Sequence, residues 1–228
     1  MTPKDEPRNY SSPACYLHEF AAPGEPDPQS WDQIKVWRKA RREELIGRRT
    51  AREAPARRQL GLPVLKYLFD SIDVNSCPVL GIYWPIRGEI DLREIARRHV
   101  AAGGVVALPV VVQKAAPVEF WRWQPGVALR RGLWNIPIPR ERRPVEPNVL
   151  IVPLVGFDAS RYRLGYGGGF YDRTLAAAAP RPRTIGVGLA DAELPTIYPQ
   201  SHDIPMDVIV TDRSTFSSHA RTPATPLP

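Results

Sequence analysis

The sequence predicts an α/β fold, a three-layer α/β/α arrangement around a mostly parallel sheet with Rossmann-like topology. Two observations carry this prediction. Apolar runs of strand length alternate along the chain with segments of helical periodicity, which is the order of repeated strand–helix units. In Pro78–Val112 one such unit has short loops on both sides of its helix, so its two strands should be parallel neighbours.

The composition is that of a globular protein, and the length suits one domain, with or without a small subdomain. The chain has 228 residues, of which 43% are hydrophobic and 24% charged, and this is enough for a large core. Its two cysteines make neither a disulfide framework nor a zinc spacing. Met1–Tyr10 is polar and no apolar run is long enough to span a membrane, so we expect no membrane association and a reduced cytoplasmic setting.

The formal net charge of +7 favours anionic ligands, among them polyphosphates and polyglutamates. Nucleic acid is the alternative partner, and charge is its only support. The basic residues concentrate in Arg38–Arg58 and Arg130–Arg143, without an aromatic and basic strand platform. A solvated helix face explains the first cluster at least as well, so we expect no nucleic acid partner.

The amino-terminal part combines an extension with two helices. Met1–Ser30 is rich in proline, serine and acids and should be irregular. Trp31–Arg49 should be a helix capped by Ser30. Its basic face is either solvated or reaches a phosphate, and the pattern alone favours the solvated alternative. Leu62–Ile72 has helical apolar spacing with Pro63 near its start, which predicts a second helix.

The first strand–helix–strand unit carries a candidate ligand group. Pro78–Pro85 and Gly104–Val112 are apolar runs suited to buried strands, and Asp91–Ala102 between them should be a helix. Glu89 follows the first strand, at the sheet edge where such units place ligand groups. A turn or capping role explains a glutamate there equally well.

The remaining strands complete the expected sheet. Residues 31–213 would form the ordered domain, and Ser214–Pro228 should be a disordered tail. Trp134 is either a core residue or an exposed platform on which a flat ring stacks, and composition alone favours the core. Further extended segments are expected at Pro117–Trp123, which reads as an edge strand, and at Trp134–Pro139, Thr184–Ala190 and Met206–Thr211.

A glycine-rich loop, Gly165–Gly169 with four glycines in five residues, lies between the buried run Val149–Val155 and the alanine-rich, helical Thr174–Ala179. Strand, glycine loop and helix is the order in which backbone N–H groups gather around a phosphate. The loop is not a P-loop, because GxxxxGK[ST] is absent. It is not a dinucleotide fingerprint either, because Phe170 stands where the last glycine should be. No GxSxG elbow is present.

An acid at the start of the helix after the loop predicts a cation. Asp172 would repel a phosphate unless a cation lay between them, and Mg²⁺ held by one or two carboxylates, phosphate oxygens and water is the simplest solution. Asp207, which opens the last apolar run, is the best second carboxylate. An ordinary role at the edge of a strand is equally well supported for Asp207.

The stretch Pro153–Leu175, PLVGFDASRYRLGYGGGFYDRTL, closely resembles the signature of the 5-formyltetrahydrofolate cyclo-ligases, also called methenyltetrahydrofolate synthetases. The resemblance extends over roughly Trp31–Asp212. Further matching segments, in the same order, are Tyr83-Trp84-Pro85 with Glu89-Ile90-Asp91, then Leu108–Val111, Trp134–Pro137 and His202–Asp207.

The resemblance implies a reaction in which ATP and Mg²⁺ support the conversion of 5-formyltetrahydrofolate to 5,10-methenyltetrahydrofolate, with release of ADP and phosphate. ATP would phosphorylate the formyl oxygen and N10 of the folate would then close the ring. The expected partner is a reduced folate, with or without a polyglutamate tail, and the protein is expected to be a monomer. By position, the resemblance implies catalytic roles for Arg163, Tyr171 and Asp172; ATP binding by Lys35, Arg38, Arg163, Leu164, Gly165, Tyr166, Gly167, Gly168, Gly169, Phe170 and Tyr171; folate binding by Tyr83, Glu89 and Trp134; and Mg²⁺ binding by Asp172 and Asp207.

Three departures from the family pattern stand out. Phe170 replaces the first of two tyrosines that some members carry, and Gly168 stands where some have lysine. On the first helix Arg38 fits the family's arginine, whereas Lys35 lies one residue from the lysine position. The loop therefore depends on a cation from this helix. A folate- or nucleotide-binding relative with little or no ligase activity is the alternative function.

Overall fold

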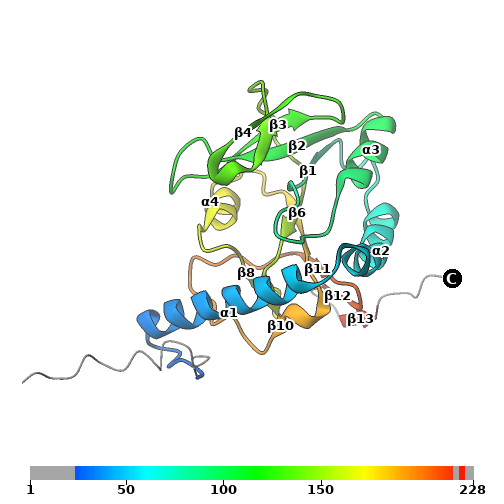
Figure 1. Cartoon of the computed structure of the whole chain (residues 1–228). Helices are drawn as coiled ribbons and strands as arrows, with labels where there is room; N and C mark the ends of the chain where they lie inside the picture. The colour runs from blue at the N-terminus through cyan, green and yellow to red at the C-terminus, as the bar shows by residue number, and fades with distance from the viewer. Residues whose placement is uncertain (1–23, 218–220, 224–228) are drawn as a thin grey trace, which may run out of the picture.

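The computed structural model describes residues 24–217 and 221–223. Its centre is an eight-stranded sheet with the order β13-β12-β11-β9-β6-β1-β2-β3 (Figure 1). The strands of this sheet are β1 (Val79–Gly81), β2 (Val105–Val110), β3 (Glu119–Trp123), β6 (Val149–Pro153), β9 (Arg183–Val187), β11 (Val208–Val210), β12 (Ser214–Ser217) and β13 (Arg221–Pro223).

The inner strands of this sheet run parallel and the outer ones antiparallel. β11, β9, β6, β1 and β2 pair in parallel, while β3, β12 and β13 pair antiparallel to their neighbours. The parallel pairing of β1 with β2 and the position of β3 at an edge confirm two predictions from the sequence. The mostly parallel sheet confirms the predicted fold class.

Helices cover both faces of the sheet. They are α1 (Trp31–Ala51), α2 (Ala54–Ser71), α3 (Arg93–Ala101) and α4 (Phe170–Ala177). In β6, Val149 and Ile151 face a core shared with α2 and α3, and Leu150 and Val152 face a second core with residues of α1 and α4. Figure 1 shows α2 and α3 on one side of the sheet and α4 on the other. This alternation in a buried strand produces the three layers.

Two helices begin earlier than the sequence predicts. α2 starts at Ala54 and carries Pro63 in its interior, so the proline does not mark a start: the helix continues past the missing N–H. α4 starts at Phe170, with Asp172 in its first turn, because Gly169 in a left-handed conformation ends the loop there. The predicted cap of α1 is confirmed, since the Ser30 hydroxyl accepts a hydrogen bond from the backbone N–H of Gln33 at 3.5 Å.

Most short strands outside the main sheet were not predicted. Pro137–Pro139 falls within the expected extended segment Trp134–Pro139, whereas Trp134 and Asn135 lie in a 3-10 helix, so that part of the prediction is wrong. A three-stranded sheet combines β7 (Gly156–Asp158), β8 (Arg163–Leu164) and β10 (Glu193–Leu194), and a hairpin pairs β4 (Leu129–Arg131) with β5 (Pro137–Pro139). 3-10 helices η2 (Leu133–Asn135) and η3 (Ala190–Ala192) lie beside them. β7 and β8 matter for function because they lead the chain from β6 to the glycine loop.

The carboxyl-terminal part corrects one prediction. The expected disordered tail begins at Ser214, yet β12 starts there and pairs with β11. The Thr211 hydroxyl closes the connecting turn by donating to the Ser214 carbonyl at 2.8 Å, and Phe216 is buried against Phe157 at 5.2 Å between ring centroids. Residues 218–220 and 224–228 of the predicted tail, and 1–23 of the predicted extension, lie outside the described residues.

Within the described ranges no helix is long and apolar enough to cross a membrane.

Candidate functional site

The sheet reverses its direction of growth between β1 and β6. From β1 the chain passes through α3 to β2 on one side, and from β6 it passes through α4 to β9 on the other. In open α/β sheets the crevice at this reversal, outside the carboxyl ends of the strands, is where ligands bind. Glu89 follows β1 and the glycine loop follows β6, so the two predicted halves of the site arise from adjacent strands.

A tight turn after β1 holds Glu89. The backbone N–H of Glu89 donates to the Ile86 carbonyl at 3.0 Å, and its carboxylate Oε2 accepts from the Ile86 N–H at 2.8 Å. Arg87 and Gly88 between them both have positive φ, 47° and 77°. A left-handed arginine is uncommon and marks a turn held in shape by its surroundings.

The Glu89 carboxylate is buried and bonded to the glycine loop. Its side chain is only 3% exposed, and Oε1 accepts a hydrogen bond from the Tyr166 hydroxyl at 2.6 Å. Burial raises the pKa of Glu89, while the hydrogen bonds from Tyr166 and Ile86 and the nearby Arg49 oppose that shift. The group is thus a hydrogen-bond acceptor removed from water, and it does more than shape a turn.

Of the two aromatic residues predicted on the folate side, Tyr83 is buried and Trp134 is exposed. Tyr83 is buried and its hydroxyl donates to the Ile90 carbonyl at 2.9 Å. Trp134 is 64% exposed, so the preference for a core position drawn from composition is wrong. Its backbone has a φ of 54°, and its ring meets the edge of Phe170 at 5.6 Å. The hairpin turn between β4 and β5 therefore presents the indole next to the glycine loop.

The glycine loop uses its glycines for different reasons. Gly167 and Gly169 have φ of 91° and 61°, where other residues are strained. Gly168 leaves room for the ring of Phe170, which would lie 2.7 Å from an added Cβ. Among the described residues no hydrogen bond occupies the N–H groups of Gly167, Gly168 or Gly169. These amides precede the amino end of α4 and can bind an anion.

Arg163 and Asp172 form a largely buried ion pair behind the loop. Arg163 Nη2 lies 2.7 Å from Asp172 Oδ2, and both side chains also bond the backbone of Ile204, the arginine to its carbonyl and the aspartate to its N–H, each at 3.0 Å. The Arg163 guanidinium lies 5.9 Å from the ring centre of Tyr171. Burial raises the pKa of Tyr171, which keeps its hydroxyl neutral. Leu164 is buried in the core behind them.

The two predicted metal ligands are linked through the segment 204–207 without a direct hydrogen bond. Asp172 bonds Ile204, while Asp207 Oδ2 accepts from the N–H and hydroxyl of Thr184 at 2.7 and 2.8 Å. Asp207 Oδ1 lies 3.6 Å from Arg181. In the part of the chain that the structure covers, no three histidine, cysteine or acidic side chains gather as a metal cluster.

α1 brings arginines to the glycine loop, and among the described residues the hydrogen bonds to the loop come from residues other than Lys35 and Arg38. Arg38 donates to the carbonyls of Ile197 and Tyr198 and to Asp203, and Lys35 pairs with Asp32 at 2.6 Å. Among the described residues no hydrogen bond or ion pair joins either side chain to the glycine loop. Arg42 is joined to it by a 2.7 Å hydrogen bond from Nε to the Gly165 carbonyl.

Arg49 is the second cation that sequence reasoning missed. Its Nη2 donates to the Tyr166 hydroxyl at 2.6 Å and lies 3.9 Å from Glu89. Arg42 and Arg49 follow Arg38 by four and eleven positions, and at 3.6 residues per turn all three lie on one face of the helix. That spacing was the signal available in the sequence.

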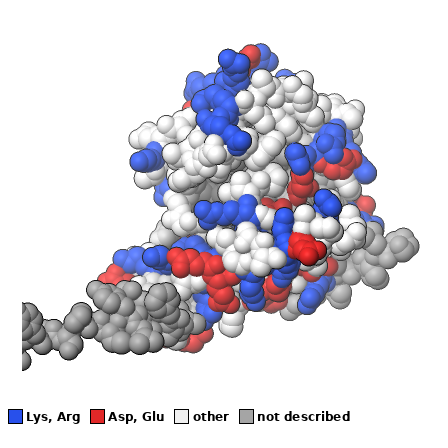
Figure 2. Space-filling model, viewed as in Figure 1, with Lys and Arg blue, Asp and Glu red and all other residues white. Residues whose placement is uncertain are grey.

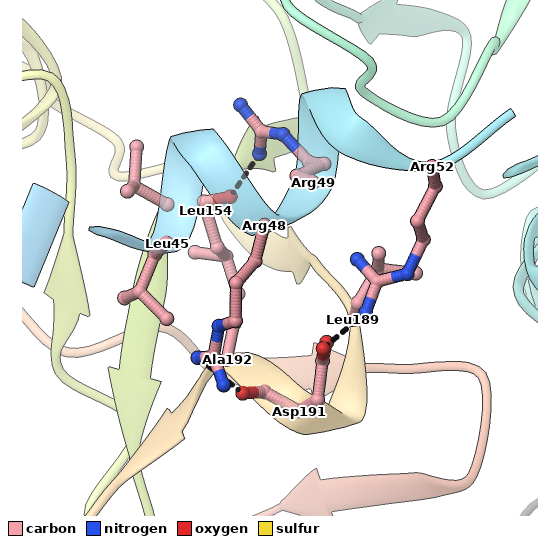
Figure 3. Close-up of a pocket in the computed structure, with 9 residues that line it drawn as sticks. Leu45, Arg48, Arg49, Arg52, Leu154, Leu189, Asp191 and Ala192 are labelled. Atoms are coloured by element: carbon pink, nitrogen blue, oxygen red, sulfur yellow. Dashed lines mark hydrogen bonds and ion pairs between the residues drawn. The ribbon is translucent and has the colours of Figure 1, made fainter. Parts of the chain in front are cut away.

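A small pocket lies under the carboxyl end of α1, and Arg49 is among the residues that line it. In Figure 3 Arg48 and Arg52 point toward Asp191, whereas Arg49 points away and bonds the Leu154 carbonyl at 2.9 Å. These contacts fasten α1 to the segments after β6 and β9. Figure 2 shows further basic side chains along α1 and over β4 on the same face of the molecule.

These features define an α/β protein in which a glycine loop and a buried carboxylate, from adjacent strands, meet at the switch point of the sheet. The model of the 5-formyltetrahydrofolate cyclo-ligase family matches residues 34–212. The chain belongs to this family, and it is an enzyme of the ligase class.

Known relatives agree with this placement. The 5-formyltetrahydrofolate cyclo-ligase of Escherichia coli K12 is 32% identical over 172 residues, covering 72% of this chain and 94% of that protein. The Mycolicibacterium smegmatis protein of the same name is 34% identical over 140 residues, covering 58% and 72%. The solution structure of Aquifex aeolicus 5,10-methenyltetrahydrofolate synthetase has a TM-score of 0.69 and 26% identity, and the match covers 84% of this chain and 96% of that one.

Proposed function

We propose that the protein uses ATP and Mg²⁺ to convert 5-formyltetrahydrofolate to 5,10-methenyltetrahydrofolate, with release of ADP and inorganic phosphate. One observation carries this proposal beyond family membership. The glycine loop and the Glu89 carboxylate follow different strands and are joined by the Tyr166 hydroxyl, which donates to Glu89. A phosphate on the loop amides and a reduced folate on the carboxylate would then lie side by side.

The proposed reaction needs no protein nucleophile. The formyl oxygen attacks the γ-phosphorus of ATP, which is a substrate here, and ADP leaves. N10 then attacks the formyl carbon and loses its proton. The carbon–oxygen bond breaks, and its electron pair leaves with inorganic phosphate. Positioning and charge stabilisation suffice for such a reaction, as in phosphoryl transfer generally.

On the ATP side, the amides of Gly167–Gly169 and the positive end of α4 would bind phosphate oxygens. Arg42 supports this assignment because only its Nε is engaged among the described residues, by the Gly165 carbonyl. Its two terminal nitrogens remain for a phosphate. Arg163 would act more indirectly, because its side chain is 4% exposed and its guanidinium is paired with Asp172. Whether Lys35 or Arg38 contacts ATP stays a prediction.

On the folate side, Glu89 would accept hydrogen bonds from the donor edge of the pterin, and Trp134 would stack against an aromatic ring. The exposure of Trp134 beside Phe170 supports this role. Tyr83 would contribute its ring, since its hydroxyl is taken by the Ile90 carbonyl.

The residues present fit Mg²⁺ that is held mainly by phosphate. Mg²⁺ commonly takes one or two carboxylates and completes its shell with phosphate oxygens and water. Asp172 and Asp207 would supply the carboxylates. The Asp207 side chain is 46% exposed, with Oδ2 on Thr184 and Oδ1 toward Arg181. When bound, Mg²⁺ would offset the negative charge of the phosphates.

We further propose that the enzyme acts as a monomer in the cytoplasm, on reduced folates with or without a polyglutamate tail. The net charge of +7 supports an anionic substrate of this kind.

The test is formation of the methenyl absorbance by purified protein with ATP, Mg²⁺ and 5-formyltetrahydrofolate. The expected result is product formation that requires both ATP and Mg²⁺ and that falls to background in Asp172→Ala. Folate binding without turnover by the wild-type protein would instead support the alternative of a binding-only relative.

A further inference from the structure

Tyr166 lies in the glycine loop but bonds the folate side of the site. Its neighbours Gly165 and Gly167 belong to the predicted phosphate loop. Its hydroxyl, however, donates to Glu89 Oε1 and accepts from Arg49 Nη2, both at 2.6 Å. Its ring also faces the Arg87 guanidinium at 5.7 Å. The tyrosine therefore ties the loop after β6 to the turn after β1.

The hydrogen bond from Tyr166 occupies an oxygen of Glu89 to which a ligand would bind. The carboxylate has two hydrogen-bond donors among the described residues, the Tyr166 hydroxyl and the Ile86 N–H. Ile86 belongs to the same tight turn and is fixed there. Tyr166 is a side chain that is 37% exposed on a loop bordered by glycines. The Glu89 side chain is only 3% exposed, and the Tyr166 hydroxyl is the donor from outside the turn that a ligand would replace on the carboxylate.

We propose that the Tyr166 hydroxyl couples the two substrate sites, by holding Glu89 in the ligand-free enzyme and leaving it when either the folate or the nucleotide binds. This inference rests on the proposed function. A pterin on Glu89 replaces the tyrosine as donor and frees the loop. A nucleotide that rearranges the loop withdraws Tyr166 and exposes the carboxylate.

Positive cooperativity follows from this arrangement. Each ligand breaks the same hydrogen bond, so the ligand that binds second does not need to break it again. By linkage, the nucleotide must strengthen folate binding by the same factor by which folate strengthens nucleotide binding. We expect a factor of about ten, which lies within the range usual for coupled sites.

The experiment measures the dissociation constant of 5-formyltetrahydrofolate by calorimetry, with and without a non-hydrolysable ATP analogue and Mg²⁺. Tyr166→Phe keeps the ring over Arg87 and removes only the hydroxyl. Tyr198→Phe is the matched control, because its hydroxyl also donates to a glutamate, Glu25, on the exposed surface. A thermal unfolding curve for each variant shows that it is folded.

In the wild type and in Tyr198→Phe, the analogue should tighten folate binding about tenfold. Tyr166→Phe should bind folate more tightly than the wild type when no nucleotide is present, and the analogue should then have almost no effect. An unchanged coupling factor in a folded Tyr166→Phe would overturn the inference and leave the proposed function standing. Absence of folate binding by the wild type would overturn both.

Discussion

Gly167→Ala tests whether the shape of the glycine loop matters for ATP. Gly167 has a φ of 91°, a conformation that costs a residue with a side chain about 1–2 kcal/mol. An added Cβ would meet the nearest atom, Arg42 Cζ, at 3.5 Å, which is ordinary contact. The cost is therefore conformational. Because Gly167 is exposed, the mutant loop can relax without unfolding the core, and the cost should appear when ATP requires the original shape.

We expect the dissociation constant of MgATP to rise roughly 5- to 30-fold, the equivalent of 1–2 kcal/mol. Calorimetric titration measures it, and urea denaturation should show nearly unchanged stability. Gly165→Ala is the control in the same loop, because its φ is not left-handed and an added Cβ meets nothing within 4 Å. Equal losses of affinity in the two variants, or none in Gly167→Ala, would refute the reasoning.

Three further predictions concern single side chains. Arg42→Met should weaken MgATP binding about tenfold or more, since a hydrogen bond to a charged group contributes roughly 1.5–3 kcal/mol. The control is Arg41→Met, which should bind MgATP as the wild type does because Arg41 pairs with Glu44. Burial raises the pKa of Glu89 above its ordinary 4.5, so between these two values the folded state holds a proton that the unfolded state has lost. The free energy of unfolding should therefore fall as pH rises from about 4.5 through the higher pKa. Glu89→Gln should flatten that pH dependence in urea titrations, and an unchanged slope would contradict the prediction. Burial also raises the pKa of the Cys77 thiol to about 11. In a Cys15→Ser background, the native protein should therefore react with a thiol reagent at pH 8 far more slowly than the urea-unfolded protein. Equal rates of reaction would show that Cys77 is accessible.

Much of the fold follows from local pattern. Helical periodicity and strand-length apolar runs gave the order of the main elements, and the short loops around Asp91–Ala102 correctly implied parallel neighbours. The short strands of the β7-β8-β10 sheet were not predicted, because two or three residues are too few to show an alternation of apolar and polar side chains. β12 escaped because its pairing depends on a turn closed by Thr211 and Ser214, in a segment whose composition resembles a tail.

The site was predicted in part. Position and spacing offered Glu89 as a candidate ligand group alongside a turn role, and the family resemblance implied its folate role; the structure joins Glu89 to the glycine loop through Tyr166. The spacing showed that Arg38, Arg42 and Arg49 share a helix face, but not which of them bonds a loop more than 110 positions away, because that depends on how the helix packs. Arg38 turns to the 197–203 segment, and Arg42 and Arg49 on the same helix face meet the site instead. The bond from Tyr166 to Glu89 had no counterpart in any local pattern.

The α1 contacts bear on the choice between a ligase and a binding-only relative. The sequence left the loop short of positive charge unless Lys35 or Arg38 reached it. If the proposed function holds, Arg42 would meet that need from the same helix, and Arg49 would add a cation between the loop and Glu89. A cation near the developing charge on the phosphates is what phosphoryl transfer requires. The missing lysine at Gly168 is therefore no argument against turnover.

The central claim is that ATP and the folate react with one another in the crevice between β1 and β6. The most direct measurement uses 5-formyltetrahydrofolate that carries oxygen-18 in its formyl group, with the inorganic phosphate analysed by mass spectrometry after turnover. If the formyl oxygen attacks ATP, each phosphate formed with a methenyl product contains one labelled oxygen. Methenyl product accompanied by unlabelled phosphate would contradict the claim, because water and not the folate would then have received the phosphoryl group.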